Sequence, residues 1–220
     1  MSIAGYIDHT NLKQDATRAD IVKLCGEARG AGFAAVCVPP VFVREAREQL
    51  AESGVKIATV IGFPFGYHLA SIKSAEAELA IMSGADELDM VINIAALKSG
   101  EWNILETEIR DMLEVVKLHG KALKVIVESG ILSMDELLRC CEFYSRFGID
   151  FMKTSTGYAS AGASVEAVKT MRAHLPERIA IKASGGIRSY AFAQELIAAG
   201  ATRIGASASM QILAESGQSQ

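Results

Sequence analysis

The sequence predicts an α/β protein, a single-domain (β/α)₈ TIM barrel, from three observations. Amphipathic stretches with helical spacing alternate along the chain with short apolar, often β-branched runs. A glycine stands directly before most of these runs, and the runs number eight. Strand–helix alternation implies parallel pairing through right-handed crossovers, and eight such units in 220 residues fit the short end of the range for this barrel.

The predicted strands are the apolar runs taken in chain order. The glycine before six of them suits the left-handed residue that closes a preceding helix. The first strand opens the chain, and the seventh follows a turn that contains Pro176. The predicted strands are residues 4–8, 33–38, 55–61, 85–92, 121–127, 149–152, 178–183 and 201–206.

The stretches between the strands carry helix start signals and helical periodicity. Thr17 with Asp20 three residues later, and Ser133 with Glu136, form the capping-box pattern. The apolar residues that follow such signals recur on one face of a helix. Two of these faces are Ile21, Leu24, Cys25 and Ala28, and Leu105, Ile109, Met112 and Val116.

Composition and charge narrow the classes of function. The chain is 50% hydrophobic and 22% charged, as in a globular protein, and its formal net charge is −4. Because there is no basic block, we expect no binding to nucleic acid or to an anionic membrane. The opening segment has no cationic region before an apolar core, so we do not expect it to be a secretory signal. No apolar run is long enough to span a bilayer.

Residues that bind metals or form disulfides show no motif spacing. The four cysteines lack a CxxC pattern, which favours reduced thiols and a cytoplasmic location, and the four scattered histidines predict no metal site.

We assign residues 1–213 to the barrel and expect the polar residues 214–220 to be a frayed tail. The structural rival is a doubly wound open sheet, whose strands are usually more continuously apolar.

Chemistry in this barrel is expected at the carboxyl ends of the strands. Lys153 and Lys182 end neighbouring predicted strands, and Asp89 lies on the strand two before that of Lys153. Two close, partly buried ammonium groups lower each other's pKa, and a free amine is a nucleophile toward carbonyl carbon. With an aspartate nearby to move protons, this set of residues predicts Schiff-base chemistry.

Simpler explanations exist for each residue taken alone. A single lysine at a strand end is most often solvated or ion-paired. Lys124 can be structural, pairing with Asp8 or another carboxylate inside the barrel. Cys37 can be a small core residue, and Glu87 can simply face solvent. The joint presence of two rim lysines and Asp89 weakens these explanations.

Two glycine-containing loops follow the last two predicted strands, with the sequences SGGI and GAS. In this fold, the loops after the seventh and eighth strands often hold a phosphate. Glycine lets backbone N–H groups approach an anion, and the start of a helix adds a favourable dipole. The candidate phosphate-binding residues in these loops are Gly185, Gly186, Gly205 and Ser207.

Several motifs resemble those of the deoxyribose-phosphate aldolase family. They are IDHTNLK, VIGFPFG, GADELDMVINIAALKSG, DFMKTSTG and IKASGGIR, and the similarity runs from about residue 3 to about residue 213. The resemblance implies a class I aldolase on a (β/α)₈ barrel, without cofactor or metal. The implied reaction is reversible cleavage of 2-deoxy-D-ribose 5-phosphate to D-glyceraldehyde 3-phosphate and acetaldehyde, in deoxynucleoside catabolism.

Matching positions imply roles for individual residues. Lys153 is implied as the lysine that forms the Schiff base, and Lys182 as the group that lowers its pKa and relays protons. Asp89 is implied as the acid/base residue, working through an ordered water. Residues implied to bind substrate phosphate are Thr156, Gly157, Gly185, Gly186, Gly205 and Ser207. Residues implied to line or support the pocket are Asp8, Thr10, Cys37 and Lys124. A homo-oligomer is also implied, with a dimer favoured.

The chain departs from the family pattern at several positions. Asn11 and Ala95 are unusual, Ala208 follows Ser207 where relatives commonly have a second serine, and no tyrosine lies beyond Tyr190 to act from a C-terminal tail. We hypothesise that Ala208 weakens phosphate binding; a strong preference for deoxyribose 5-phosphate over deoxyribose in kcat/KM would refute this. Two alternative functions remain on the same fold. One is a phosphosugar isomerase with a carboxylate base, and the other is a non-catalytic sugar-phosphate binder.

Overall fold

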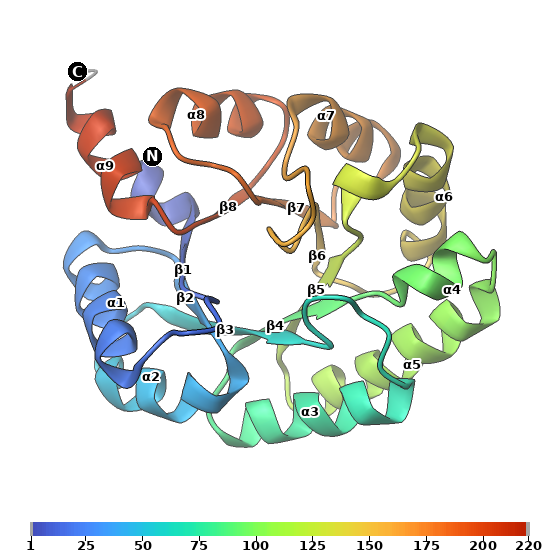
Figure 1. Ribbon diagram of the computed structural model, residues 1–220, viewed down its shortest axis with the longest axis horizontal. Helices are drawn as coiled ribbons and strands as arrows, with labels where there is room; N and C mark the ends of the chain where they lie inside the picture. The colour runs from blue at the N-terminus through green and yellow to red at the C-terminus, as the bar shows by residue number, and fades with distance from the viewer. Residues whose placement is uncertain (1, 219–220) are drawn as a thin grey trace.

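The computed structural model describes residues 2–218, and within them the chain forms the predicted barrel. The parallel strands pair in chain order from β1 to β8, and β8 pairs with β1 to close the sheet. The helices form an outer layer around the strands (Figure 1). The strands are β1 (Ile7–Thr10), β2 (Ala35–Val38), β3 (Lys56–Ile61), β4 (Glu87–Val91), β5 (Ala122–Ile126), β6 (Phe151–Lys153), β7 (Ala180–Ser184) and β8 (Arg203–Ala206).

Each strand is followed by at least one α-helix, as the alternation in the sequence predicts. The α-helices of the described residues are α1 (Arg18–Ala31), α2 (Val43–Gln49), α3 (Ala70–Met82), α4 (Ile94–Lys98), α5 (Trp102–Leu118), α6 (Met134–Tyr144), α7 (Val165–His174), α8 (Tyr190–Ala198) and α9 (Ser209–Gln218). Short 3₁₀ helices span Ile3–Tyr6, Pro40–Phe42 and Ser129–Ile131.

The helix signals seen in the sequence are present in the structure. At the start of α1, the Asp20 N–H donates to the Thr17 hydroxyl and the Thr17 N–H donates to the Asp20 carboxylate, at 3.3 and 2.8 Å. Ser133 and Glu136 form the same capping box at α6. Gly32 closes α1 in the left-handed conformation, with a φ of 67°.

The observed strands begin one to three residues later than predicted. The largest difference is at the N-terminus, where residues 4–6 belong to the 3₁₀ helix Ile3–Tyr6 instead of β1. The Ser2 hydroxyl accepts a hydrogen bond from the Ala4 N–H at 3.4 Å, and this turn packs Ile3 and Ala4 into the core. Local capping and burial therefore shorten the first strand.

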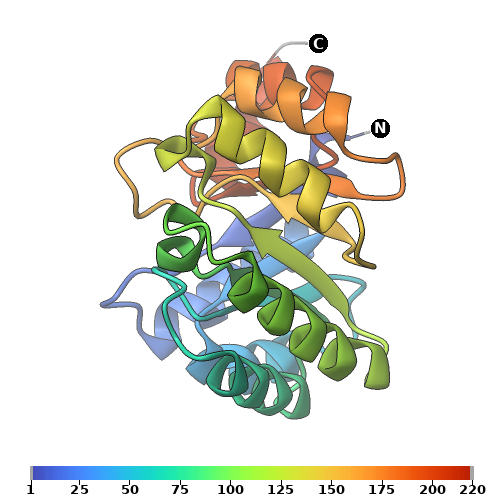
Figure 2. The ribbon, with the colours of Figure 1, turned by 90° about the vertical axis from the view of Figure 1, so that its right-hand side faces the viewer.

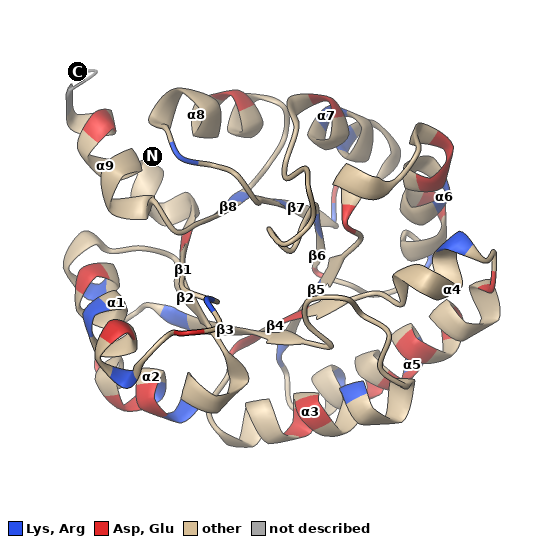
Figure 3. Cartoon of the chain, viewed as in Figure 1, with Lys and Arg blue, Asp and Glu red and all other residues tan. Residues whose placement is uncertain are grey.

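The apolar core lies between the sheet and the helices. Ile57, Leu88 and Ile181 are fully buried there, and in side view α5 and α6 run along the outside of the strands (Figure 2). Because side chains alternate along a strand, the other face points to the barrel axis. Charged residues occupy much of that face, where this fold commonly has layers of aliphatic side chains; Figure 3 shows acidic and basic positions on the strands.

The end of the chain differs from the expected arrangement in one respect. Residues 214–218 of the expected frayed tail form the last part of α9, and residues 219 and 220 lie outside the described residues. Each of the four cysteines is a buried free thiol. No helix within residues 2–218 combines the length and apolarity needed to cross a membrane.

Candidate active site

The strand register brings the two predicted lysines and Asp89 together inside the barrel. Lys153 at the end of β6 is the register partner of Lys182 in β7, so both side chains point to the same face. Asp89 in β4 is likewise the register partner of Lys124 in β5. All four side chains are buried.

Asp89 is the point where the three lysines meet. Lys153 Nζ lies 2.8 Å and Lys182 Nζ lies 2.7 Å from the same oxygen, Asp89 Oδ2. Lys124 Nζ lies 2.6 Å from the other oxygen, Oδ1. One carboxylate therefore accepts hydrogen bonds from three ammonium or amine groups.

The ion pairs continue along the barrel interior and close into a ring. Asp8 contacts Lys182 through Oδ2 and Arg203 Nη1 through Oδ1, the second at 2.7 Å. Arg203 Nη1 and Lys124 Nζ both reach Glu87 Oε2, at 3.1 and 2.6 Å. Three carboxylates thus alternate with three cations. This charge ring consists of Asp8, Lys182, Asp89, Lys124, Glu87 and Arg203.

Burial and pairing have opposite effects on the pKa values of the charge ring. Burial raises the pKa of the aspartates, but the adjacent cations outweigh it. They lower the pKa of Asp8 to about 2 and hold that of Asp89 well below its ordinary range. Burial lowers the pKa of Lys124 and Lys182, but their carboxylate partners reverse this and raise it. These four groups are therefore ionised at neutral pH.

Lys153 has the opposite shift. Burial lowers its pKa, Asp89 works to raise it, and the charge of Lys182 lowers it again, so that the net pKa lies below the ordinary value for a lysine. Lowering the pKa of an amine increases the fraction present as the nucleophile. Of the two rim lysines, Lys153 is therefore the one suited to attack a carbonyl group.

Gly205 in β8 makes room for the Lys182 side chain. A Cβ atom at this position would lie 3.1 Å from Lys182 Cε and 3.0 Å from Ser184 Cβ. Gly205 is also the register partner of Asp8, which Lys182 contacts. The missing side chain therefore lets Lys182 in β7 extend past β8 to its carboxylate partner in β1.

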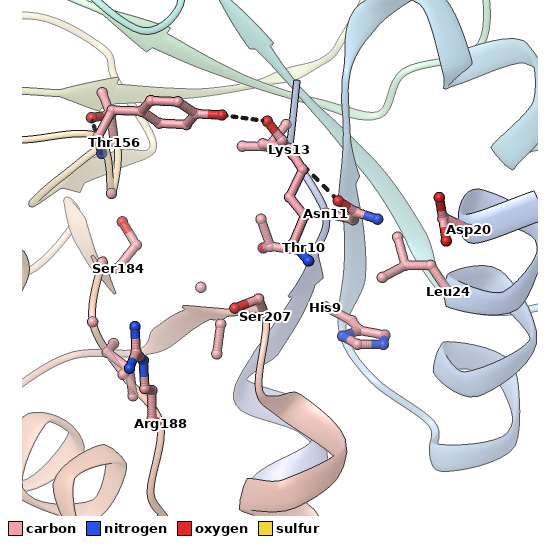
Figure 4. Close-up of a pocket in the computed structure, with 18 of the residues that line it drawn as sticks. His9, Thr10, Asn11, Lys13, Asp20, Leu24, Thr156, Ser184, Arg188 and Ser207 are labelled. Atoms are coloured by element: carbon pink, nitrogen blue, oxygen red, sulfur yellow. Dashed lines mark hydrogen bonds between the residues drawn. The ribbon is translucent and has the colours of Figure 1, made fainter. Parts of the chain in front are cut away.

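A cavity of about 540 Å³ opens at the carboxyl ends of the strands, with Lys153 in its lining. It is formed mainly by the segments that follow β1, β6, β7 and β8. Ser184 and Arg188 lie on one side of it, Thr10 and Asn11 on the other, and Ser207 between them (Figure 4). The predicted site residues in its lining are Thr10, Lys153, Thr156, Gly157, Gly185, Gly186, Gly205 and Ser207.

One end of the cavity is suited to an anion. Gly185 and Gly186, both in the lining, have φ values of 88° and 77°, a conformation that favours glycine. The side chains of Arg188 and Lys13 add two cations to the lining. Within the described residues, no group of three or more His, Cys, Asp or Glu side chains is placed to hold a metal ion.

Comparison with known proteins places the chain in a family. Residues 2–217 match the family described as DeoC/LacD family aldolase. The chain belongs to this family. A deoxyribose-phosphate aldolase from Caldanaerobacter subterraneus subsp. tengcongensis is 50% identical over 216 residues, which cover 98% of this chain and 94% of that protein. Another, from Aciduliprofundum boonei, is 49% identical over 96% of this chain and 95% of that protein.

The fold of this DeoC/LacD family aldolase also matches a solved structure. The tetrameric deoxyribose phosphate aldolase from Aeropyrum pernix superposes with a TM-score of 0.91 at 31% sequence identity. The match covers 99% of this chain and 92% of that chain. The barrel and its eight strands are therefore those of the family.

Three of the four predicted pocket residues do not line the cavity, and neither do the predicted catalytic residues Asp89 and Lys182. Asp8 and Lys124 are members of the charge ring, and Cys37 in β2 is buried in a small apolar cluster. Lys124 forms ion pairs inside the barrel, as expected if its role is structural. Its partners are Glu87 and Asp89 and not Asp8.

Two members of the charge ring are not among the residues predicted from the sequence. Arg203 has no predicted role, and the expectation that Glu87 can face solvent is wrong, since this residue is only 1% exposed. The signal that could have found both is strand alternation. Arg203 stands two residues before Gly205, and Glu87 two before Asp89, so each shares the interior face of its strand.

Glu128, directly after β5, is a further site residue without a predicted role. Its buried carboxylate accepts hydrogen bonds from the Thr156 N–H, at 3.2 Å, and from the Thr156 hydroxyl. The residue has a φ of 58°, which is uncommon for a residue with a side chain and is often found at functional sites. Burial raises the pKa of Glu128 against the effect of these hydrogen bonds. Glu128 therefore fixes the start of the β6–α7 loop beside the cavity.

Proposed function

We propose that the chain is a deoxyribose-phosphate aldolase that cleaves 2-deoxy-D-ribose 5-phosphate through a Schiff base on Lys153. The enzyme is a lyase of the class I type. The observation that carries this proposal is the shared oxygen of Asp89, where Lys182 is held charged by a second carboxylate and Lys153 is not. Relatives of almost the same length that carry this name support the substrate.

The first step is formation of the iminium ion. The neutral amine of Lys153 adds to the C1 aldehyde of the open-chain sugar, and the resulting carbinolamine takes up a proton and loses water. Lys182 and Asp89, which both lie beside Lys153, would relay this proton through a water. The iminium ion then serves as the electron sink for the next step.

The second step breaks the C2–C3 bond. Removal of the proton from the 3-hydroxyl lets C3 become the aldehyde of D-glyceraldehyde 3-phosphate. The electron pair of the C2–C3 bond forms the C1–C2 double bond of an enamine on Lys153. Protonation of the enamine at C2 and addition of water at C1 then release acetaldehyde and the free amine. All of this chemistry uses side chains of the chain itself.

The anion-binding end of the cavity would hold the substrate phosphate. Gly185, Gly186 and Ser207 lie in the loops after β7 and β8, where this fold commonly binds phosphate. Arg188 and Lys13 would add charge. Thr156, Gly157 and Gly205 complete the proposed phosphate side, and Thr10 lines the sugar side. This supports a preference for phosphorylated substrate despite Ala208.

The alternative of a phosphosugar isomerase is less well supported. Such an enzyme would need a carboxylate as its base. The pKa of Asp89 is held well below its ordinary range because three lysines surround it, which makes it a weak base by itself. A purely binding protein would not need a lysine with a lowered pKa in the cavity.

We also infer a cytoplasmic location and assembly into a homo-oligomer, with a dimer favoured. Four free thiols suit a reducing compartment. Exposed apolar side chains on and just before α3, namely Leu69, Ile72, Leu79 and Met82, suit a surface covered by a second copy. Light scattering after size exclusion should give twice the mass of the 23.5 kDa chain; a monomer would refute the assembly.

Activity assays test the proposed function. Purified enzyme should release D-glyceraldehyde 3-phosphate from 2-deoxy-D-ribose 5-phosphate, measured by coupling to NADH oxidation, and Lys153→Leu should be inactive. Lys98, an exposed lysine on α4, provides the control, and Lys98→Leu should retain full activity. Cleavage that persists at the wild-type rate in Lys153→Leu would refute the proposal.

A further inference from the structure

Among residues 2–218, Lys153 is the one amine of the barrel interior that lies outside the charge ring. Each ring cation contacts two different carboxylates: Lys182 contacts Asp8 and Asp89, Lys124 contacts Glu87 and Asp89, and Arg203 contacts Asp8 and Glu87. Lys153 contacts Asp89 alone, through an oxygen that Lys182 also uses. Lys153 therefore has fewer carboxylate contacts than Lys182, Lys124 or Arg203.

The ring is electrically balanced without Lys153. Its three carboxylates carry three negative charges, and its three cations carry three positive charges. Net charge is costly in a buried site, because there is little water to solvate it. A protonated Lys153 would be a fourth positive charge opposite three negative ones, so loss of its proton restores the balance.

Arg203 is the third cation of the charge ring and pairs with Asp8 and Glu87, the two carboxylates that Lys153 does not contact. Its side chain is 13% exposed, it donates to Asp8 and Glu87, and its guanidinium lies 5.4 Å from the centre of the Phe151 ring. Without Arg203, Asp8 and Glu87 would each lose one cation. The ring would then hold three carboxylates and two cations, and a protonated Lys153 would be the charge that restores neutrality.

We propose that Arg203 is a positioning residue for the Schiff-base lysine: by closing the charge ring it leaves Lys153, and no other amine, as the surplus base. The proposal rests on the proposed function, since it assigns the reason why Lys153 is the nucleophile. Arg203 does not line the cavity, so it acts through the ring without touching substrate.

The other groups around Lys153 do not supply a second carboxylate contact. Cys37 from β2 and Lys182 from β7 act on its charge, together with Asp89 from β4. Glu128, after β5, is within electrostatic range, but its oxygens are bound by Thr156. Lys56, at the start of β3, is not a member of the charge ring but lies 3.6 Å from Glu87. Its side chain is largely exposed, so water screens its charge.

Four variants test the charge balance, two that change it and two that preserve it. Arg203→Gln removes a positive charge and should raise the pH at which Lys153 loses its proton. Glu87→Gln removes a negative charge and should lower that pH. The double variant removes both charges, leaves two carboxylates with two ring cations, and should return the midpoint toward the wild-type value. Arg203→Lys keeps the charge and should also stay near the wild type.

The experiment measures the rate at which acetaldehyde and cyanoborohydride alkylate Lys153 between pH 5 and pH 10, by mass spectrometry of the Lys153 peptide. Comparison with wild type at each pH removes the reagent's own pH dependence. We expect the midpoint in Arg203→Gln to rise by about one pH unit or more, which slows labelling about tenfold below the midpoint. Arg47→Gln, which breaks an arginine–carboxylate pair outside the barrel interior, should leave the midpoint unchanged.

The outcomes separate the inference from the proposed function. If wild-type protein is not labelled at Lys153, the proposed function is wrong. If wild type is labelled but the midpoint of Arg203→Gln is unchanged, or moves in the same direction as that of Glu87→Gln, only the role of Arg203 is refuted. If Arg203→Gln does not fold, Glu87→Gln and the double variant still differ only by Arg203, and removal of the arginine must raise the midpoint.

Discussion

Lys153 Nζ and Lys182 Nζ both lie within hydrogen-bonding distance of the same oxygen, Asp89 Oδ2, at 2.8 and 2.7 Å. The two amines differ in what else they contact, because Lys182 also reaches Asp8 and Lys153 faces the cavity. A pair of identical side chains is thereby divided into a lysine held charged by two carboxylates and a nucleophile.

Removal of the Lys182 ammonium group should raise the pKa of Lys153. In Lys182→Leu, Asp8 and Asp89 lose a partner, and the positive charge that lowers the pKa of Lys153 is gone. We expect kcat at pH 7 to fall by on the order of 10²-fold or more, with part of it recovered at alkaline pH. A pH–rate profile checks this, and near-normal rates at pH 7 in folded Lys182→Leu would contradict the coupling.

A single methyl group at Gly205 should disturb the site without changing any charge. The new Cβ in Gly205→Ala would be 3.1 Å from Lys182 Cε, so the lysine must shift away from Asp8. Misplacement by a fraction of an ångström to 1 Å typically costs up to about 10²-fold in rate. Steady-state kinetics measure the loss. Gly26→Ala, on the outside of α1 where no atom lies within 4 Å of the added Cβ, is the matched control and should remain active.

The contact between Glu128 and Thr156 should matter more for substrate binding than for the chemical step. In Glu128→Ala, the Thr156 N–H and hydroxyl lose their acceptor, so the start of the β6–α7 loop is no longer fixed. We expect KM for deoxyribose 5-phosphate to rise about tenfold, equivalent to about 1.4 kcal/mol, with a smaller change in kcat. A fall in kcat at unchanged KM would show instead that Glu128 acts on the reacting groups.

The charge ring should make the fold sensitive to acid. Asp8 has its pKa lowered from 3.8 to about 2 in the folded protein, so its stabilising contribution is complete above pH 4 and is lost as the pH falls through 2. The shift corresponds to about 2 kcal/mol. Urea unfolding between pH 5 and pH 2 measures it. The free energy of unfolding should depend less on pH in Asp8→Asn, and an equally steep dependence in the variant would count against this role of Asp8.

Much of the fold and part of the site can be predicted from the sequence. Glycine before six of the eight apolar runs, together with the alternation of apolar and amphipathic stretches, is sufficient to count the strands, because these are local signals. The second helix after β4 is not predicted. The position of Lys153 and Lys182 at the ends of neighbouring strands likewise follows from the order of the apolar runs. The first strand is predicted too long because the turn Ile3–Tyr6 depends on packing against the core.

The remaining site residues depend on contacts between strands that are distant in sequence. Arg203 in β8 reaches Glu87 in β4, and only the register and closure of the barrel bring them together. Glu128 has a left-handed backbone conformation although it is neither glycine nor asparagine, the residues that usually signal this conformation in a sequence. Residues of this kind could be suspected from alternation but not assigned from one sequence.

In the proposed reaction, Lys153 forms a Schiff base with the aldehyde. Wild-type protein incubated with acetaldehyde and reduced with borohydride should carry one stable ethyl group on Lys153, found by peptide mapping with mass spectrometry. Lys153→Leu should carry none at the active site and should have no aldolase activity. An adduct on Lys182 in place of Lys153, or wild-type protein that remains active but gives no adduct, would show that Lys153 is not the Schiff-base lysine.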